Sequence, residues 1–162
     1  CFTEAKSGRF NGRDFRLLTK QDREIDDLGA RLWCNEIPTK FGFLGWCAWK
    51  SILPTDENVQ KKGLQMASRC FCCDIPQAES VSHLFYQSDW AHGLWSSTAE
   101  WGVLVGACDS LQELFSVWFL GTEPEQMESK IRCIIAMAVI WSIWEARNMA
   151  RHVNRPSICL LQ

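Results

Sequence analysis

The longest apolar run in the sequence extends from Cys133 to Trp144, twelve residues interrupted only by Ser142. A membrane-spanning helix needs about 18 or more predominantly apolar residues. We therefore interpret the run as a helix that the rest of the protein or a partner covers, and we expect no membrane interaction. With 162 residues, of which 47% are hydrophobic, the chain is long enough to bury such a helix in a core that does not depend on a metal.

Capping and turn residues divide the preceding part of the chain into short helices. Pro38 fits the first turn of a helix within residues 33–49, which we expect to be buried almost all round. Thr55 fits the cap of a short helix that Gly63 ends. A longer helix is expected over residues 79–101. Because alternating β-branched residues are nearly absent, the pattern predicts a mainly α fold.

Further helices are expected near the two ends of the chain, the first of them at residues 13–20. Two segments fit a capping box, in which a hydroxyl and a carboxylate satisfy free N–H groups: Ser110 with Glu113 and Thr122 with Glu125. They predict helices over residues 111–120 and 124–151. The second of these contains the apolar run and forms the expected C-terminal apolar helix.

The chain has nine cysteines, an odd number. Only Cys70, Cys72 and Cys73 lie close together in the sequence. A secreted disulfide framework has a different pattern, so we expect a reducing compartment. No charged segment followed by an apolar one precedes the first helix, which also argues against export. The expected location is intracellular, nuclear or cytoplasmic. The chain begins at Cys1, without a methionine, so we expect a fragment of a longer reading frame.

Cys70-Phe71-Cys72-Cys73 contains a C-x-x-C, and His83 follows Cys73 by ten residues. Two cysteines at this spacing can direct both sulfurs at one ion, and a structural zinc site adds two further ligands, commonly from the start of a helix. Cys70, Cys73 and His83 are therefore the candidate metal ligands, in a short zinc-knuckle-like loop between helices. The fourth ligand is expected near Gln87 and Ser88, and Ser88 is a poor zinc ligand.

Several groups compete for the fourth position. Asp89 and His92 point away from His83 if one helix is continuous through them, and come closer only if a helix begins later. Cys72 could replace Cys73, and water could complete a weaker three-ligand site. Alternatively, the cysteines are small buried apolar residues and His83 is hydrogen-bonded in the core.

Charge is distributed in three zones. Residues 1–69 contain twelve Lys or Arg and nine acids, residues 70–129 contain nine acids and no Lys or Arg, and residues 130–162 contain five basic residues and one acid. Because cations supply most nucleic-acid affinity, the middle zone is a poor phosphate surface. The candidate contacts to RNA or DNA lie in the flanking zones, with ordinary solvated charge as the alternative: Lys61, Lys62, Arg69, Arg147, Arg151 and Arg155.

A set of short motifs occurs in a fixed order over residues 30–150: Leu32-Trp33, Ile37-Pro38-Thr39-Lys40, Phe43, Trp46, Leu53-Pro54-Thr55, Lys62-Gly63, the Cys70 and Cys73 pair, Glu79-Ser80, His83-Leu84-Phe85, Trp95, and Trp141, Trp144, Arg147 and Asn148. The set resembles the plant reverse-transcriptase zinc-binding domain, found near the C-terminus of LINE-type retrotransposon polyproteins and in reading frames derived from them. That family has H-L-F-x-x-C at the histidine motif, so Ser88 stands where its last cysteine would be.

The resemblance implies a polar lead-in (1–29), a zinc-binding-like domain (30–101), a C-terminal helical segment (102–155) and a tail (156–162). It also implies a degenerate zinc-binding module, without catalytic residues, that assists a retrotransposon-derived polyprotein in engaging nucleic acid. No hydrolase, phosphate-loop or metalloprotease motif is present. The alternative is a helical protein-interaction or structural module that binds neither metal nor nucleic acid. Its partner would be the missing polymerase segments or another protein, docked on the 124–151 helix.

Overall fold

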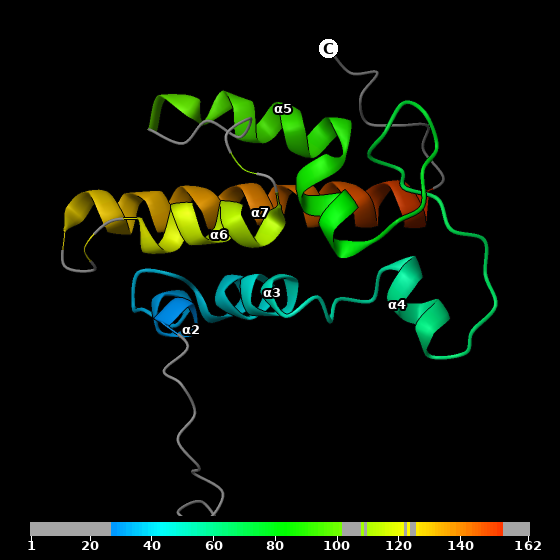
Figure 1. Cartoon of the computed structure of the whole chain (residues 1–162), viewed down its shortest axis with the longest axis horizontal. Coiled ribbons are helices and arrows are strands. Elements are labelled where there is room, and N and C mark those ends of the chain that lie inside the picture. Colours follow the sequence, from blue (N-terminus) through cyan, green and yellow to red (C-terminus); the bar gives the residue numbers. More distant parts are fainter. Residues whose placement is uncertain (1–26, 102–107, 109, 122, 124–125, 154–162) are drawn as a thin grey trace, which may run out of the picture.

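The computed structural model describes residues 27–101, 108, 110–121, 123 and 126–153, and within these ranges every regular element is a helix (Figure 1). The mainly α prediction is therefore confirmed. In chain order the elements are α2 (Asp27–Leu32), α3 (Thr39–Trp49), α4 (Asp56–Lys61), the π-helix η1 (His83–Gln87), α5 (Asp89–Ser97), the 3-10 helix η2 (Ala99–Trp101), α6 (Leu111–Leu120) and α7 (Met127–Val153).

Helix α7 is the centre of the fold. It packs against α3, α5, α6 and η1, and Figure 1 shows α3 and α5 on opposite sides of the α6 and α7 pair. Gly45 of α3 permits a close approach, since a Cβ there would lie 2.8 Å from the Met137 sulfur. Met137, Ile140 and Ile143 are at most 1% exposed. One face of the apolar run is thus buried by the protein's own helices, whereas Ile134, on another face, is 46% exposed.

Helix α7 is much longer than the twelve-residue apolar run within it. The segment Met127–His152 is long and apolar enough to cross a membrane, and half of its apolar window is buried inside the protein. The twelve-residue run alone did not show this. A long core helix has the same length and composition, and contact with four other elements is the packing expected of such a helix.

Aromatic contacts join the helices across the core. Trp95 of α5 lies 5.5 Å from Trp118 of α6, measured between ring centroids, and Trp49 of α3 lies 5.7 Å from Phe115. Phe85 of η1 stacks on Trp144 of α7 at 6.3 Å. Such pairs add to the burial of large apolar surfaces. The described helices on both sides of the predicted boundary at residue 101 therefore share one hydrophobic core.

The helix predicted within residues 33–49 and the short helix predicted after Thr55 both occur, with changed details. Helix α3 begins after Pro38 and ends at Trp49. It is less covered than the expected burial almost all round, since Phe43 is 57% exposed and Trp46 and Trp49 are partly buried. Helix α4 follows Thr55, and Gly63 has the positive φ of 88° that favours glycine after a helix end. The Thr55 hydroxyl makes no capping bond.

The predicted helix over residues 79–101 is divided at Ser88. The π-helix η1 ends there and α5 begins, with the Ser88 hydroxyl accepting a hydrogen bond from the Ala91 N–H at 3.2 Å. A serine that satisfies an N–H of the next helix is a favourable N-cap, and this favours a new helix over continuation of the old one. The chain therefore changes direction beside the candidate ligands.

The C-terminal helices lie close to their predicted positions. Ser110 caps α6 by accepting from the Glu113 N–H at 3.1 Å, and α7 begins at Met127 rather than at residue 124. Five predicted features lie wholly or mostly outside the described residues: the polar lead-in 1–29, the helix at 13–20, the Thr122 and Glu125 capping box, Arg155 and the tail 156–162.

Candidate metal centre

Residues 70–77 form a loop that is closed on itself and attached to α5. The Cys70 N–H donates to the Gln77 carbonyl at 2.7 Å and closes the loop. The Trp90 N–H donates to the Cys72 carbonyl at 3.2 Å, and the Asp74 N–H donates to the Asp89 carboxylate at 3.0 Å. The last two bonds hold the part of the loop on either side of Cys73 against the first turn of α5.

The structure brings Cys70, Cys73 and His83 together. One ligand atom from each lies within 4.8 Å of the other two, and the Cys73 sulfur is 3.2 Å from the His83 Nε2 atom. All three side chains are buried, with exposed fractions of 0%, 4% and 5%. In a tetrahedral zinc site with sulfur and nitrogen ligands, the ligand atoms are separated by about 3.5–4 Å. Small adjustments would therefore bring the three atoms to ligating positions.

His83 begins the π-helix, and both of its backbone groups are hydrogen-bonded. Its N–H donates to the Ser80 hydroxyl at 3.0 Å, and its carbonyl accepts from the Ser88 N–H at 2.7 Å, a bond that spans five residues. Single π-turns are rare and occur frequently at functional sites. The wide turn fixes the backbone on both sides of the candidate ligand.

The cluster favours protonated thiols when no metal is bound. A hydrogen bond with the Cys72 thiol, followed by burial, raises the pKa of Cys70. Burial raises the pKa of Cys73 to about 11. The hydrogen bond with Cys70 raises the pKa of His83. A metal ion binds thiolates and neutral imidazole, so binding at neutral pH must displace both thiol protons.

The donor set fits zinc. Two thiolates and one imidazole are ligands that Zn²⁺ prefers, and their burial matches a structural site rather than an exposed catalytic one. Such an ion would cross-link the loop that contains the two cysteines to η1. In the part of the chain that the structure describes, no other group of three His, Cys, Asp or Glu converges in this way.

Glu79 and Arg147 form a buried pair beside the cluster. The Arg147 guanidinium donates to both Glu79 carboxylate oxygens, at 2.6–3.2 Å, and to the Pro54 carbonyl at 3.1 Å. The Asp56 N–H donates to Glu79 at 3.3 Å, so this carboxylate caps α4 in place of the Thr55 hydroxyl. Arg151 donates to Asp56 at 2.6 Å.

Sequence reasoning placed Arg147 and Arg151 among the candidate nucleic-acid contacts and missed their acidic partners. Arg147 is 4% exposed and held by Glu79, so it offers no surface to a phosphate. Arg151 is partly exposed and paired with Asp56. Glu79 and Arg147 each belong to a motif that the sequence analysis identified. The distance between these motifs along the chain does not show that the two side chains form an ion pair.

The other three candidate cations within the described residues are exposed. Lys61 pairs with Glu57 on the surface of α4 at 2.7 Å, Lys62 follows it, and the Arg69 guanidinium lies over the Phe71 ring at 5.5 Å. Arg69 immediately precedes the first candidate metal ligand. These three residues, at the end of α4 and in the following loop, form the exposed basic group nearest to the cluster in sequence.

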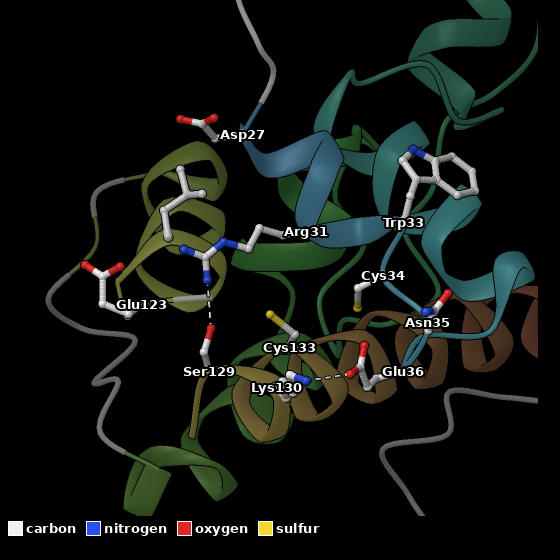
Figure 2. A pocket seen from close by; sticks show the side chains of 11 residues that line it. Asp27, Arg31, Trp33, Cys34, Asn35, Glu36, Glu123, Ser129, Lys130 and Cys133 are labelled. Atoms are coloured by element: carbon white, nitrogen blue, oxygen red, sulfur yellow. Dashed lines mark hydrogen bonds and ion pairs between the residues drawn. The ribbon is translucent and has the colours of Figure 1, made fainter. Parts of the chain in front are cut away.

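A pocket of about 700 Å³ lies between α2, the loop after it and the first turns of α7 (Figure 2). Lys130 binds Glu36 at 2.8 Å and Arg31 donates to the Ser129 hydroxyl at 2.7 Å, which links the walls. None of the lining residues belongs to the metal cluster. The pocket is therefore separate from the candidate centre.

The fold and this cluster define a helical protein with a buried Cys₂His group suited to a structural metal ion. The family described as zinc-binding in reverse transcriptase matches residues 13–95, just over half of the 162 residues, and the chain belongs to this family. The match includes all three candidate ligands and ends within α5. No curated protein and no solved structure matches the chain.

Proposed function

We propose that the chain is a non-catalytic zinc-binding module of a reverse-transcriptase-related polyprotein, with Cys70, Cys73 and His83 holding one structural zinc ion. The convergence of their three ligand atoms in a buried site supports this most strongly. The plant, LINE-type origin implied by the sequence resemblance belongs to the same proposal. So does an intracellular location, nuclear or cytoplasmic, because ligating cysteines must stay reduced.

Metal analysis of the purified chain tests the zinc assignment. We expect one zinc per chain in the wild type and none in Cys70→Ser, measured by atomic absorption after gel filtration. Cys34→Ser is the matched control, since Cys34 is only partly buried and lies outside the cluster; it should retain zinc. A folded wild-type chain that contains no zinc, even after incubation with Zn²⁺, would contradict the assignment.

We further propose that the module assists nucleic-acid engagement through Lys61, Lys62 and Arg69. Their exposure and their position next to the cluster support this. Replacing all three with Gln should weaken binding to single-stranded RNA in fluorescence anisotropy. The log–log salt slope should fall by about 2, since each phosphate contact contributes about 0.7. Lys130→Gln, at the separate pocket, is the control and should bind like the wild type. Equal binding by the triple variant would contradict the proposal.

A further inference from the structure

The three converging ligands leave one corner of a tetrahedral site without an assigned ligand. Ser88, at the position of the family's last cysteine, does not fill it. Its hydroxyl donates to the Leu84 carbonyl at 2.9 Å and accepts from the Ala91 N–H at 3.2 Å, and the residue is fully buried. The hydroxyl is thus committed to backbone groups of η1 and α5.

Cys72 is also buried, but it meets one ligand only. Its thiol is hydrogen-bonded with Cys70. Its sulfur is not among the atoms that converge within 4.8 Å. The Cys72 carbonyl is held by the Trp90 N–H, so bringing this thiol toward His83 would require the loop backbone to move.

Asp89 is the first residue of α5, because α5 begins one residue after Ser88, and it contacts the loop that carries both candidate cysteines. It interacts through its backbone with the Cys73 thiol, which partly offsets the burial that raises the pKa of Cys73. Its carboxylate accepts from the Asp74 N–H, so it lies over the same loop. Its negative charge acts on both Cys73 and His83. Asp89 is exposed, whereas the three ligands are buried, so the carboxylate stands at the solvent edge of the cluster.

We propose that a carboxylate oxygen of Asp89 supplies the fourth zinc ligand in this chain, in place of the cysteine that Ser88 has replaced. The inference rests on the proposed zinc function. Aspartate oxygen is an established zinc ligand. The Asp89 carboxylate is not among the atoms within 4.8 Å, so ligation requires rotation of its side chain. The Asp74 N–H then loses its acceptor, and because Asp74 is exposed, water can replace it.

Cobalt substitution tests the assignment, because Co²⁺ reports ligand type and geometry in its absorption spectrum. The full chain is titrated with Co²⁺ and then Zn²⁺, and the Asp89→Asn variant is compared with Asp74→Asn, which removes a neighbouring charge. We expect Asp89→Asn to weaken zinc binding at least ~10-fold, as loss of even an outer group does, and to shift the tetrahedral d–d bands. Asp74→Asn should bind like the wild type. Asp89→Glu, which keeps a carboxylate, should retain tetrahedral bands.

Thiolate charge-transfer intensity distinguishes the competing ligands. Two thiolates are expected in the wild type and in Cys72→Ser. If Cys72→Ser loses the intensity of one thiolate, Cys72 is the fourth ligand and the proposal is overturned. Wild-type affinity and bands in Asp89→Asn would overturn it as well, while leaving the zinc function intact. A wild-type chain that binds neither Co²⁺ nor Zn²⁺ would overturn both.

Discussion

At the scale of single residues, the buried pair of Glu79 and Arg147 shows what spacing along the chain does not reveal. The two residues are 68 positions apart and both are buried, so Arg147 depends on Glu79 for compensation of its charge, and Glu79 depends on Arg147 with help from Arg151 at 3.5 Å. Cys70, Cys73 and His83 could be predicted as one site because their ligand chemistry and local spacing are visible in the sequence. An ion pair between distant segments has no such signature, and both residues individually look like ordinary surface charges.

Arg147→Met is expected to lower the free energy of unfolding by up to about 3–5 kcal/mol, because it removes the main counter-charge of the buried Glu79 carboxylate and leaves only Arg151, at 3.5 Å. Urea unfolding followed by circular dichroism measures this loss. Lys130→Met, which removes a half-exposed pair with Glu36, should cost only about 0–1 kcal/mol. The double variant Glu79→Gln, Arg147→Met should recover part of the loss, since no unpaired charge is then left. Equal losses at positions 147 and 130 would refute this account.

Cys133, outside the metal cluster, should make the metal-free chain less stable in alkali. Burial raises the pKa of its thiol from 9.0 to about 11. Between these two values the folded chain binds more protons than the unfolded chain, so the free energy of unfolding falls as pH rises. Urea unfolding at pH 8–11 in EDTA measures this dependence. In Cys133→Ala, the free energy of unfolding should fall less steeply with pH than in the wild type. Val139→Ala, which also shortens a buried side chain on α7, is the control. It should lower the free energy of unfolding by the same amount at every pH. If Cys133→Ala shows the same pH dependence as the wild type, the Cys133 thiol is not the cause.

At the scale of elements, the break at Ser88 was the main feature that the sequence did not predict. The apolar residues Leu84, Phe85, Leu94 and Trp95 continue at helical spacing across it, so their periodicity favours one helix. A serine is compatible with a helix interior as well as with a cap, and only tertiary contacts decide between them. Capping was predictable at Ser110, where a turn separates the apolar runs. The same break brings Asp89 to the cluster, which a continuous helix would have prevented.

Ser88→Ala should therefore destabilise the metal-free chain by about 1 kcal/mol, through loss of the N-cap of α5. Urea unfolding in EDTA provides the measurement. Ser88→Gly is the matched variant, because glycine costs only a few tenths of a kcal/mol relative to serine at an N-cap. Ser97→Ala, at the exposed end of α5, should be nearly neutral. If Ser88→Ala and Ser97→Ala unfold at the same urea concentration, Ser88 does not act as a cap.

At the scale of the whole molecule, α7 packs with the described part of the family segment and with α6 in one hydrophobic core. The family match ends at residue 95, yet Glu79 and Phe85 within it depend on Arg147 and Trp144 for their contacts. Trp95 likewise packs on Trp118 of α6. The boundary expected at residue 101 followed the motifs that carry the resemblance. Their order shows which residues follow one another along the chain, but it does not show which surfaces they cover.

A chain that ends at Trp101 should accordingly fail to fold cooperatively. It would lack α6 and α7, expose the apolar surfaces of α3 and α5, and leave the Glu79 carboxylate without its arginine. Zinc could still link Cys70, Cys73 and His83, but one local cross-link does not replace a core. We expect no sigmoidal urea transition and narrow amide proton dispersion, with or without zinc, whereas a chain that ends at Val153 and retains α7 should show both a transition and wide dispersion. A cooperative transition in the shorter chain would mean that the family segment is stable alone and that α7 is an addition to it.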